Sequence, residues 1–181
     1  MKKVYVVGSV FLFSLLLCGA LMVTAQQDKS KRPSPPAQAT WDLGGGKSVT
    51  IDYGSPRAKG RKIYGELVPF GQVWRTGANE ATTLVTPVEL SIGGTTVPAG
   101  SYTIFTVPNK DKWALVISKK TGEWGTDYPG QSNDLARVDM KVSALPSPAE
   151  NFTISFEKAG SGANLNIDWE TTRASVMVSK K

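Results

Sequence analysis

The sequence predicts an all-β protein, a single antiparallel β-sandwich of about eight or nine strands that follows an N-terminal signal peptide. Three observations support this fold class. Apolar residues recur at every second position through most of the chain, which is the period of a half-buried strand. Gly- and Pro-rich turns separate these runs at about ten-residue intervals, the spacing of sandwiches and barrels. The one segment with helical leanings, residues 63–68, is short and is stopped by Pro69.

The first 25 residues have the composition of a signal peptide. Lys2 and Lys3 precede an unbroken apolar run over residues 4–22, and Val23-Thr24-Ala25 supplies the short side chains that a signal peptidase accepts. We therefore expect cleavage near Ala25 and a periplasmic or secreted protein without stable membrane insertion. The apolar run is nearly long enough to span a bilayer, so a retained anchor is the alternative.

Residues 26–40 are polar and rich in proline, with no apolar period. This composition predicts a disordered linker. The remaining chain, residues 41–181, is long enough for one domain with one hydrophobic core.

The strands follow from alternation and from the turns between them. Gly93-Gly94 predicts a two-residue hairpin, because glycine takes positive φ without a steric penalty. Gly160-Ser161-Gly162 predicts the turn of a second hairpin. The run at residues 102–107 is apolar at nearly every position, so we expect that strand to be buried on both faces. The expected strands are residues 49–53, 88–92, 95–97, 102–107, 113–117, 152–156, 165–169 and 174–178.

Two absences limit the chemistry. The chain has no His, and its one Cys, Cys18, lies in the predicted signal peptide. The exported protein therefore has no disulfide, no imidazole base and no thiol nucleophile, and it lacks the usual ligands of zinc, copper and haem. We expect no metal and no cofactor. The net charge is +6, or +4 without Lys2 and Lys3, which is too mild to indicate nucleic-acid binding.

The long connection over residues 55–82 is the strongest candidate for a functional surface. It contains five cations, and long ordered loops in compact domains are often functional. Its 74–80 stretch gathers an aromatic ring, a guanidinium, a hydroxyl, an amide and a carboxylate around Gly77. In such a loop, the Arg75 guanidinium and the Asn79 amide can together donate hydrogen bonds to a carboxylate, a phosphate or a sugar hydroxyl. The predicted ligand-binding residues in this connection are Arg57, Arg75, Thr76, Asn79 and Glu80.

A structural interpretation of the same loop stays open. In it, Arg75 or Arg57 pairs with Glu80 or Glu66 to pin the connection as an internal polar clasp, and Asn79 caps a turn.

Trp124 is a further candidate ligand-binding residue. It lies with Tyr128 in a Gly-flanked segment, where the two rings can form a platform for a sugar. The alternative is that both rings close one end of the sandwich over the core, where most aromatic side chains lie.

Extended motifs resemble a known family. Ser-Pro-Arg-x-Lys-Gly-Arg over residues 55–61 and Leu-Val-Pro-x-Gly-x-Val-Trp-Arg-Thr-Gly-Ala-Asn-Glu-Ala-Thr over residues 67–82 closely resemble a family of exported bacterial domains of unknown function. The resemblance continues through residues 98–108 and covers nearly all of residues 41–181. It implies export and a β-sandwich fold, and it supplies no activity and no catalytic residues.

Three functions remain in view. The preferred one is a non-catalytic envelope module that binds a small anionic or carbohydrate ligand. The second is a structural or assembly domain that uses the polar clasp. The third is a carboxylate-dependent hydrolase with Glu80 as base and Arg75 as its electrostatic partner. The sequence does not determine the oligomeric state.

Overall fold

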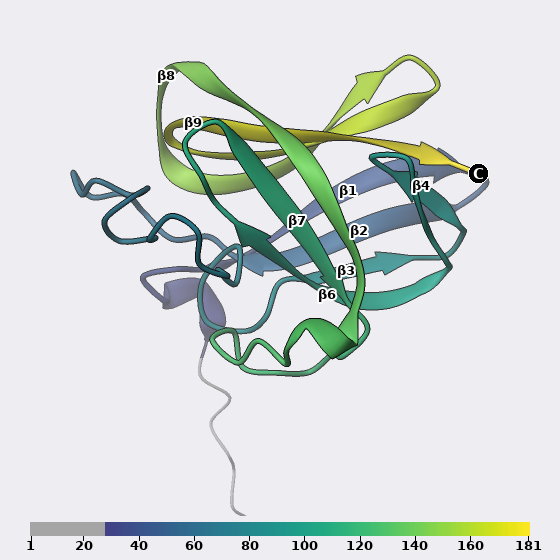
Figure 1. Ribbon diagram of the computed structural model, residues 1–181, viewed down its shortest axis with the longest axis horizontal. Helices are drawn as coiled ribbons and strands as arrows, with labels where there is room; N and C mark the ends of the chain where they lie inside the picture. Colours follow the sequence, from purple (N-terminus) through teal and green to yellow (C-terminus); the bar gives the residue numbers. More distant parts are fainter. Residues whose placement is uncertain (1–27) are drawn as a thin grey trace, which may run out of the picture.

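The computed structural model describes residues 28–181 (Figure 1). The predicted signal peptide lies outside the described residues. Within them, no helix is long and apolar enough to cross a membrane. The elements are η1 (Lys29–Lys31), β1 (Pro36–Gly44), β2 (Lys47–Gly54), β3 (Thr83–Thr86), β4 (Leu90–Ile92), β5 (Thr95–Val97), β6 (Gly100–Val107), β7 (Lys112–Ser118), η2 (Gln131–Asn133), β8 (Asp134–Ala159) and β9 (Gly162–Lys180).

The nine strands form one antiparallel sheet in the order β1-β2-β3-β6-β7-β8-β9-β4-β5. The all-β class, the antiparallel pairing and the expected number of strands are therefore confirmed. The hairpin at Gly93-Gly94 is also present, with φ values of 54° and 86° joining β4 to β5. Residues 102–106 of β6 are all buried, as the apolar run predicted.

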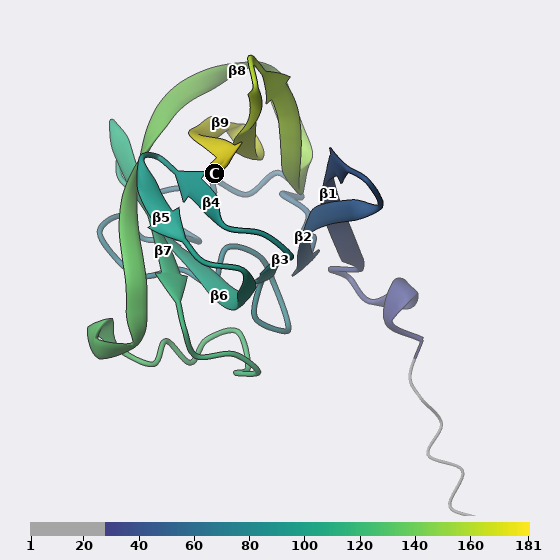
Figure 2. The same cartoon turned by 90° about the vertical axis from the view of Figure 1, so that its right-hand side faces the viewer.

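The sheet closes over its own core because its two longest strands change direction. The β8–β9 pairing is irregular between Ala144 and Thr153, and Glu170 on β9 has a φ of 53°. Both ribbons turn back at one end of the molecule in Figure 1, and Figure 2 shows the sheet curving round on itself. The second half of β8 consequently faces β1 and β2, where Phe156 stacks on Trp41 and Phe152 meets the edge of Tyr53. The two layers of the sandwich are thus parts of one continuous sheet.

Two segments have structures that their composition did not indicate. The domain begins earlier than expected, because β1 starts at Pro36, inside the segment predicted to be a disordered linker. Residues 63–68 contain no helix; they form a tight turn in which the Val68 amide donates to the Ile63 carbonyl at 2.9 Å.

An aromatic cluster forms the core beside the long 55–82 connection. Trp74 stacks on Trp169 with ring centroids 6.0 Å apart, and Tyr64 packs edge-on against Trp113 at 4.8 Å. Trp113 and Trp169 are each only 1% exposed. The connection is therefore held to the sheet by its own aromatic side chains, and this fixes the residues that follow Trp74.

Candidate functional site

The 74–80 loop is built on unusual backbone conformations. Thr76, Gly77 and Asn79 have φ values of 56°, 152° and 65°. Asn tolerates the left-handed region, but a β-branched residue such as Thr76 is strained there. Such strain persists only where surrounding contacts hold it, and it concentrates at functional loops. The Trp74 amide and carbonyl anchor the start of the loop by pairing with Thr106 of β6.

Thr76 supplies much of that restraint. Its side chain is completely buried, and its hydroxyl lies 3.1 Å from the Thr106 hydroxyl and 3.2 Å from the Trp74 carbonyl. The Thr82 hydroxyl donates to the Thr76 carbonyl at 2.8 Å. Thr76, one of the predicted ligand-binding residues, therefore has no exposed surface, and its side chain holds the loop.

Asn79 and Glu80 contact the N-terminal segment, which we define as residues 28–35. The Asn79 side-chain amide donates to the Ser34 carbonyl at 2.9 Å. The Glu80 carboxylate lies 2.9 Å from the Lys29 ammonium and 3.0 Å from the Arg32 guanidinium. These two residues therefore tie the N-terminal segment to the loop and line a small pocket of about 230 Å³ between them.

The two acidic residues named in the clasp hypothesis pair with other cations than expected. Glu80 pairs with Lys29 and Arg32, and Glu66 pairs with Lys62 at 3.3 Å, so neither carboxylate forms the expected pair with Arg57 or Arg75. Hydrogen bonding to Lys29, with a smaller contribution from Arg32, lowers the pKa of Glu80 to about 2. A carboxylate with that pKa is a weak general base, because an effective base has a pKa near the working pH.

Arg75 lines a different and larger cavity, which we call the main pocket. The main pocket has a volume of about 370 Å³, within the range of small-molecule sites. Its aromatic lining consists of Trp74, Phe105, Tyr128 and Trp169, and its charged lining consists of Arg61 and Arg75 alone. The full lining is Ser34, Pro56, Arg61, Leu67, Val68, Val73, Trp74, Arg75, Gly77, Ala78, Phe105, Gly125, Thr126, Tyr128 and Trp169.

Both guanidinium groups at the main pocket are oriented by backbone carbonyls. Arg75 Nε donates to the Gly77 carbonyl at 3.3 Å, while Arg61 donates from Nε to Ala58 at 3.0 Å and from Nη2 to Arg57 at 2.6 Å. Among residues 28–181, neither arginine has a carboxylate within ion-pair distance. Their positive charges are therefore held in place and left without a protein counter-ion.

The 119–130 loop forms a second wall of the main pocket, to which it contributes Gly125, Thr126 and Tyr128. The Gly125 amide donates to the Asn79 carbonyl at 3.2 Å, and a Cβ at Gly125 would lie 2.6 Å from Arg75 Cδ. The Tyr128 ring packs edge-on against Phe105, and its hydroxyl lies 2.9 Å from the Asp134 carboxylate and 2.7 Å from Arg137 Nη2. Close packing at Gly125 and the hydrogen bonds of Tyr128 thus fix both ends of this wall.

Trp124 lies next to that wall and remains 54% exposed. The interpretation that both aromatic residues of this segment close over the core was therefore wrong for Trp124, whereas the Tyr128 ring does pack on buried Phe105. Trp124 pairs through its backbone with Glu80 in an isolated bridge.

Arg57 borders a third hollow, which we call the cationic depression. This hollow has a volume of about 320 Å³ and is lined by Pro33, Ser34, Arg57, Lys59 and Arg61. The predicted site residues are thus distributed over neighbouring hollows and do not converge on one. Arg75 is at the main pocket, Arg57 is at the cationic depression, and Asn79 and Glu80 bind the N-terminal segment.

Sequence reasoning missed several residues of the main pocket. Arg61 was visible only as one of five cations, and Ser34 lay in the segment expected to be disordered. Within residues 28–181, no three His, Cys, Asp or Glu side chains gather as a potential metal site.

Comparison with known proteins gives a family and no activity. The family described as "Protein of unknown function (DUF2911)" matches residues 34–178. No curated protein and no solved structure matches the chain. The family match begins at the end of the N-terminal segment and covers every strand, with only the last residues of β9 beyond it. The chain therefore belongs to the DUF2911 family of proteins of unknown function.

Proposed function

We propose that this protein is a non-catalytic binding module of the cell envelope, exported by its N-terminal signal, and that it holds a small organic anion in the main pocket. The ligand carries an apolar or aromatic body and at least one carboxylate or phosphate group.

The observation that supports this proposal is the lining of the main pocket. Two arginines without carboxylate partners stand beside Trp74 and Trp169, and no acidic side chain borders the cavity. A guanidinium binds a carboxylate or phosphate with two parallel hydrogen bonds, and an aromatic wall favours an apolar body by burying its surface. The same lining disfavours a cation.

The geometry gives less support to hydrolysis. The one carboxylate with a strongly shifted pKa, Glu80, is neutralised by Lys29 and Arg32 and lies outside the lining of the main pocket. A carboxylate hydrolase needs an acid and a second carboxylate facing the same bond.

The test is ligand binding by the purified protein, measured by calorimetry and by thermal melting. The probes are benzoate, hexanoate and phenyl phosphate, with benzamide as the neutral analogue and N-acetylglucosamine as a sugar. We expect an anion to bind, and a ligand present at 100 times its Kd raises the free energy of unfolding by about 2.7 kcal/mol. Benzamide is expected to give no shift.

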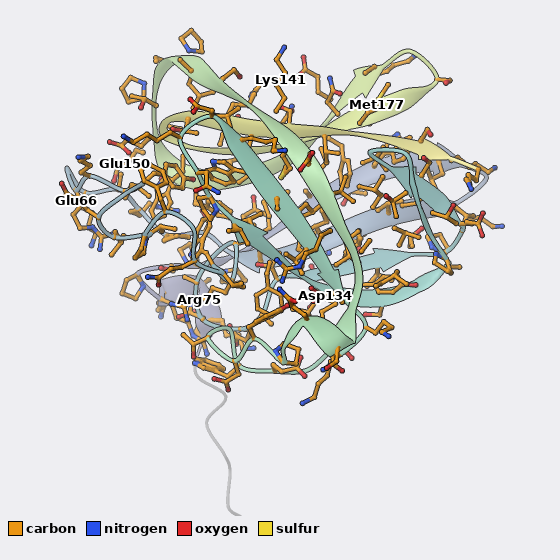
Figure 3. All side chains as sticks on the ribbon, viewed as in Figure 1. Glu66, Arg75, Asp134, Lys141, Glu150 and Met177 are labelled. Atoms are coloured by element: carbon orange, nitrogen blue, oxygen red, sulfur yellow. The ribbon has the colours of Figure 1, made fainter. Side chains whose placement is uncertain are left out.

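Arg75→Gln identifies the site. We expect at least a tenfold loss of anion affinity, because a charge-assisted hydrogen bond is removed. The melting temperature should change little, because the guanidinium has only one long hydrogen bond, to Gly77. Lys141→Gln is the matched control: it removes the same charge from an exposed residue that lies well away from Arg75 in Figure 3. Equal affinity in Arg75→Gln and the wild type would contradict the proposal, as would a large loss of stability without any ligand response.

A further inference from the structure

The cationic depression adjoins the main pocket, and the two hollows share Ser34 and Arg61 in their linings. From this continuity we infer that the ligand carries two anionic groups. One group binds Arg75 in the main pocket, and the second lies on Arg57 and Lys59. This inference rests on the proposed function and names its ligand class, a small apolar molecule with an acidic group at each end.

The charged side chains of the cationic depression all have one sign. Arg57, Lys59 and Arg61 line it together with Pro33 and Ser34, and no acidic residue does. Three like charges around one hollow repel one another, and an anion placed among them removes that repulsion.

The guanidinium of Arg57 is held in position before any ligand arrives. Its Nη1 donates to the carbonyl and to the hydroxyl of Ser55, both at 2.8 Å. Ser55 is buried, and its hydroxyl donates in turn to the Phe152 carbonyl at 2.7 Å. Anchoring through Nη1 leaves the Nε and Nη2 edge available for two parallel hydrogen bonds to an anion.

Two carboxylates close to this part of the chain accept hydrogen bonds from backbone amides. Glu150 accepts from the Lys59 amide at 2.9 Å, and Glu170 accepts from the Ile63 amide at 3.2 Å. In the part of the chain that the structure describes, neither forms an ion pair with Arg57, Lys59 or Arg61. Both line a separate hollow, to which Arg61 also contributes. Among the described residues, the cations of the cationic depression therefore have no ion-paired carboxylate, and no acidic side chain lines the hollow itself.

Arg61 stands between the two hollows and explains how one molecule can occupy both. Its Nε and Nη2 hold the backbone carbonyls of Ala58 and Arg57, which fixes the guanidinium at the shared rim. The apolar body of the ligand then lies against Trp74 and Trp169, and its second acidic group emerges past Arg61 toward Arg57.

The test compares straight-chain α,ω-dicarboxylates of increasing length with monocarboxylates of the same length, by calorimetry on the purified protein. We expect one dicarboxylate length to bind about tenfold or more tightly than its monocarboxylate, since each charge-assisted hydrogen bond adds affinity. Lys59→Gln and Arg57→Gln should remove this advantage. Lys141→Gln should leave both affinities unchanged.

Arg57→Gln could disturb folding, because Arg57 is hydrogen-bonded to buried Ser55. Lys59→Gln is expected to fold normally, because the Lys59 side chain is exposed, so it tests the inference independently. Equal affinity for mono- and dicarboxylates of every length would overturn the inference and leave the proposed function standing. A dicarboxylate advantage that survives in both variants would also overturn it. Failure of all anions to bind would remove the proposed function, and the inference with it.

Discussion

Two buried tyrosines in this fold have opposite hydrogen-bonding states, and the same substitution should change stability in opposite directions. Tyr64 is 7% exposed and its hydroxyl has no hydrogen-bond partner among the described residues, whereas the ring packs against Trp74, Trp113 and Trp169. Burial raises the pKa of Tyr64, so this hydroxyl stays protonated at any ordinary pH. Tyr53 is 8% exposed, and its hydroxyl bonds to the Ile154 amide at 3.1 Å and to the Ile154 carbonyl at 3.4 Å.

Tyr64→Phe should stabilise the protein. A buried polar group without a partner costs about 1–3 kcal/mol. Removing the oxygen leaves a small void among the indole rings, which offsets part of the gain. We therefore expect a net gain of about 1 kcal/mol, or about 2–4 °C in Tm for a domain of this size.

Tyr53→Phe should destabilise it. The substitution leaves the Ile154 amide and carbonyl without the hydroxyl that bonds to both, at a cost of about 2 kcal/mol and thus about 4–8 °C in Tm. Urea unfolding, followed by Trp fluorescence, measures both changes as shifts of the midpoint at constant m-value. Loss of stability in Tyr64→Phe, comparable to that in Tyr53→Phe, would refute the reasoning, because it would mean that the Tyr64 hydroxyl has a partner.

Two further changes concern the walls of the site. Glu80→Gln removes a carboxylate whose pKa, about 2, lies below its ordinary value of 4.5, so its contribution to stability is complete above pH 4.5 and is lost as the pH falls through about 2. The side chain is 45% exposed and solvent-screened, so we expect a loss of about 1 kcal/mol or less at pH 7 and convergence with the wild type below pH 2, measured by melting at both pH values. Gly125→Ala places a Cβ 2.5 Å from the Asn79 carbonyl oxygen and 2.6 Å from Arg75 Cδ. It should separate the two loops, cost about 1–3 kcal/mol and weaken anion binding in calorimetry, and undiminished affinity would contradict the wall described for the main pocket.

Much of the fold could be predicted because the apolar residues that recur at every second position of the sequence are the ones that the strands bury. The strand at residues 165–169 shows the expected burial of Leu165, Ile167 and Trp169, because one face of it packs on the core. The Gly93-Gly94 hairpin has a similar local cause: its turn needs positive φ at both positions, and glycine supplies it.

The missed strand β1 has a physical explanation. It is an edge strand, and only Ala39 among its residues is fully buried. It pairs with β2 from Pro36 to Gly44. Its inward residues do alternate, as Ala37, Ala39, Trp41 and Leu43, but the first two are small alanines that follow a polar, Pro-rich stretch, so the period was overlooked. A proline is tolerated there because it is the first residue of an edge strand.

The position of the candidate loop could be predicted from the sequence, but the directions and partners of its side chains could not. Residues 74–80 were recognised by their polar composition, yet the directions of their side chains depend on the left-handed conformations of Thr76 and Asn79. One of the two cationic partners of Glu80, Arg32, lies 48 residues away, and no local pattern indicates such a pair. β9 changes direction at Glu170, which also has positive φ. The sequence does not indicate this either, because a glutamate rarely adopts that conformation.

β1 also covers a strand edge that would otherwise be open to edge-to-edge pairing with other chains. It covers the edge of β2, whose Val49, Ile51 and Tyr53 are buried, and it begins with a proline and carries exposed polar side chains at Gln38, Thr40 and Asp42. A strand with buried apolar residues, such as β2, recruits other chains by edge-to-edge pairing once its edge is uncovered. Proteolysis after residue 40 would cut β1 in half and expose that edge, so such a fragment is expected to aggregate even though it retains every side chain of the main pocket except Ser34.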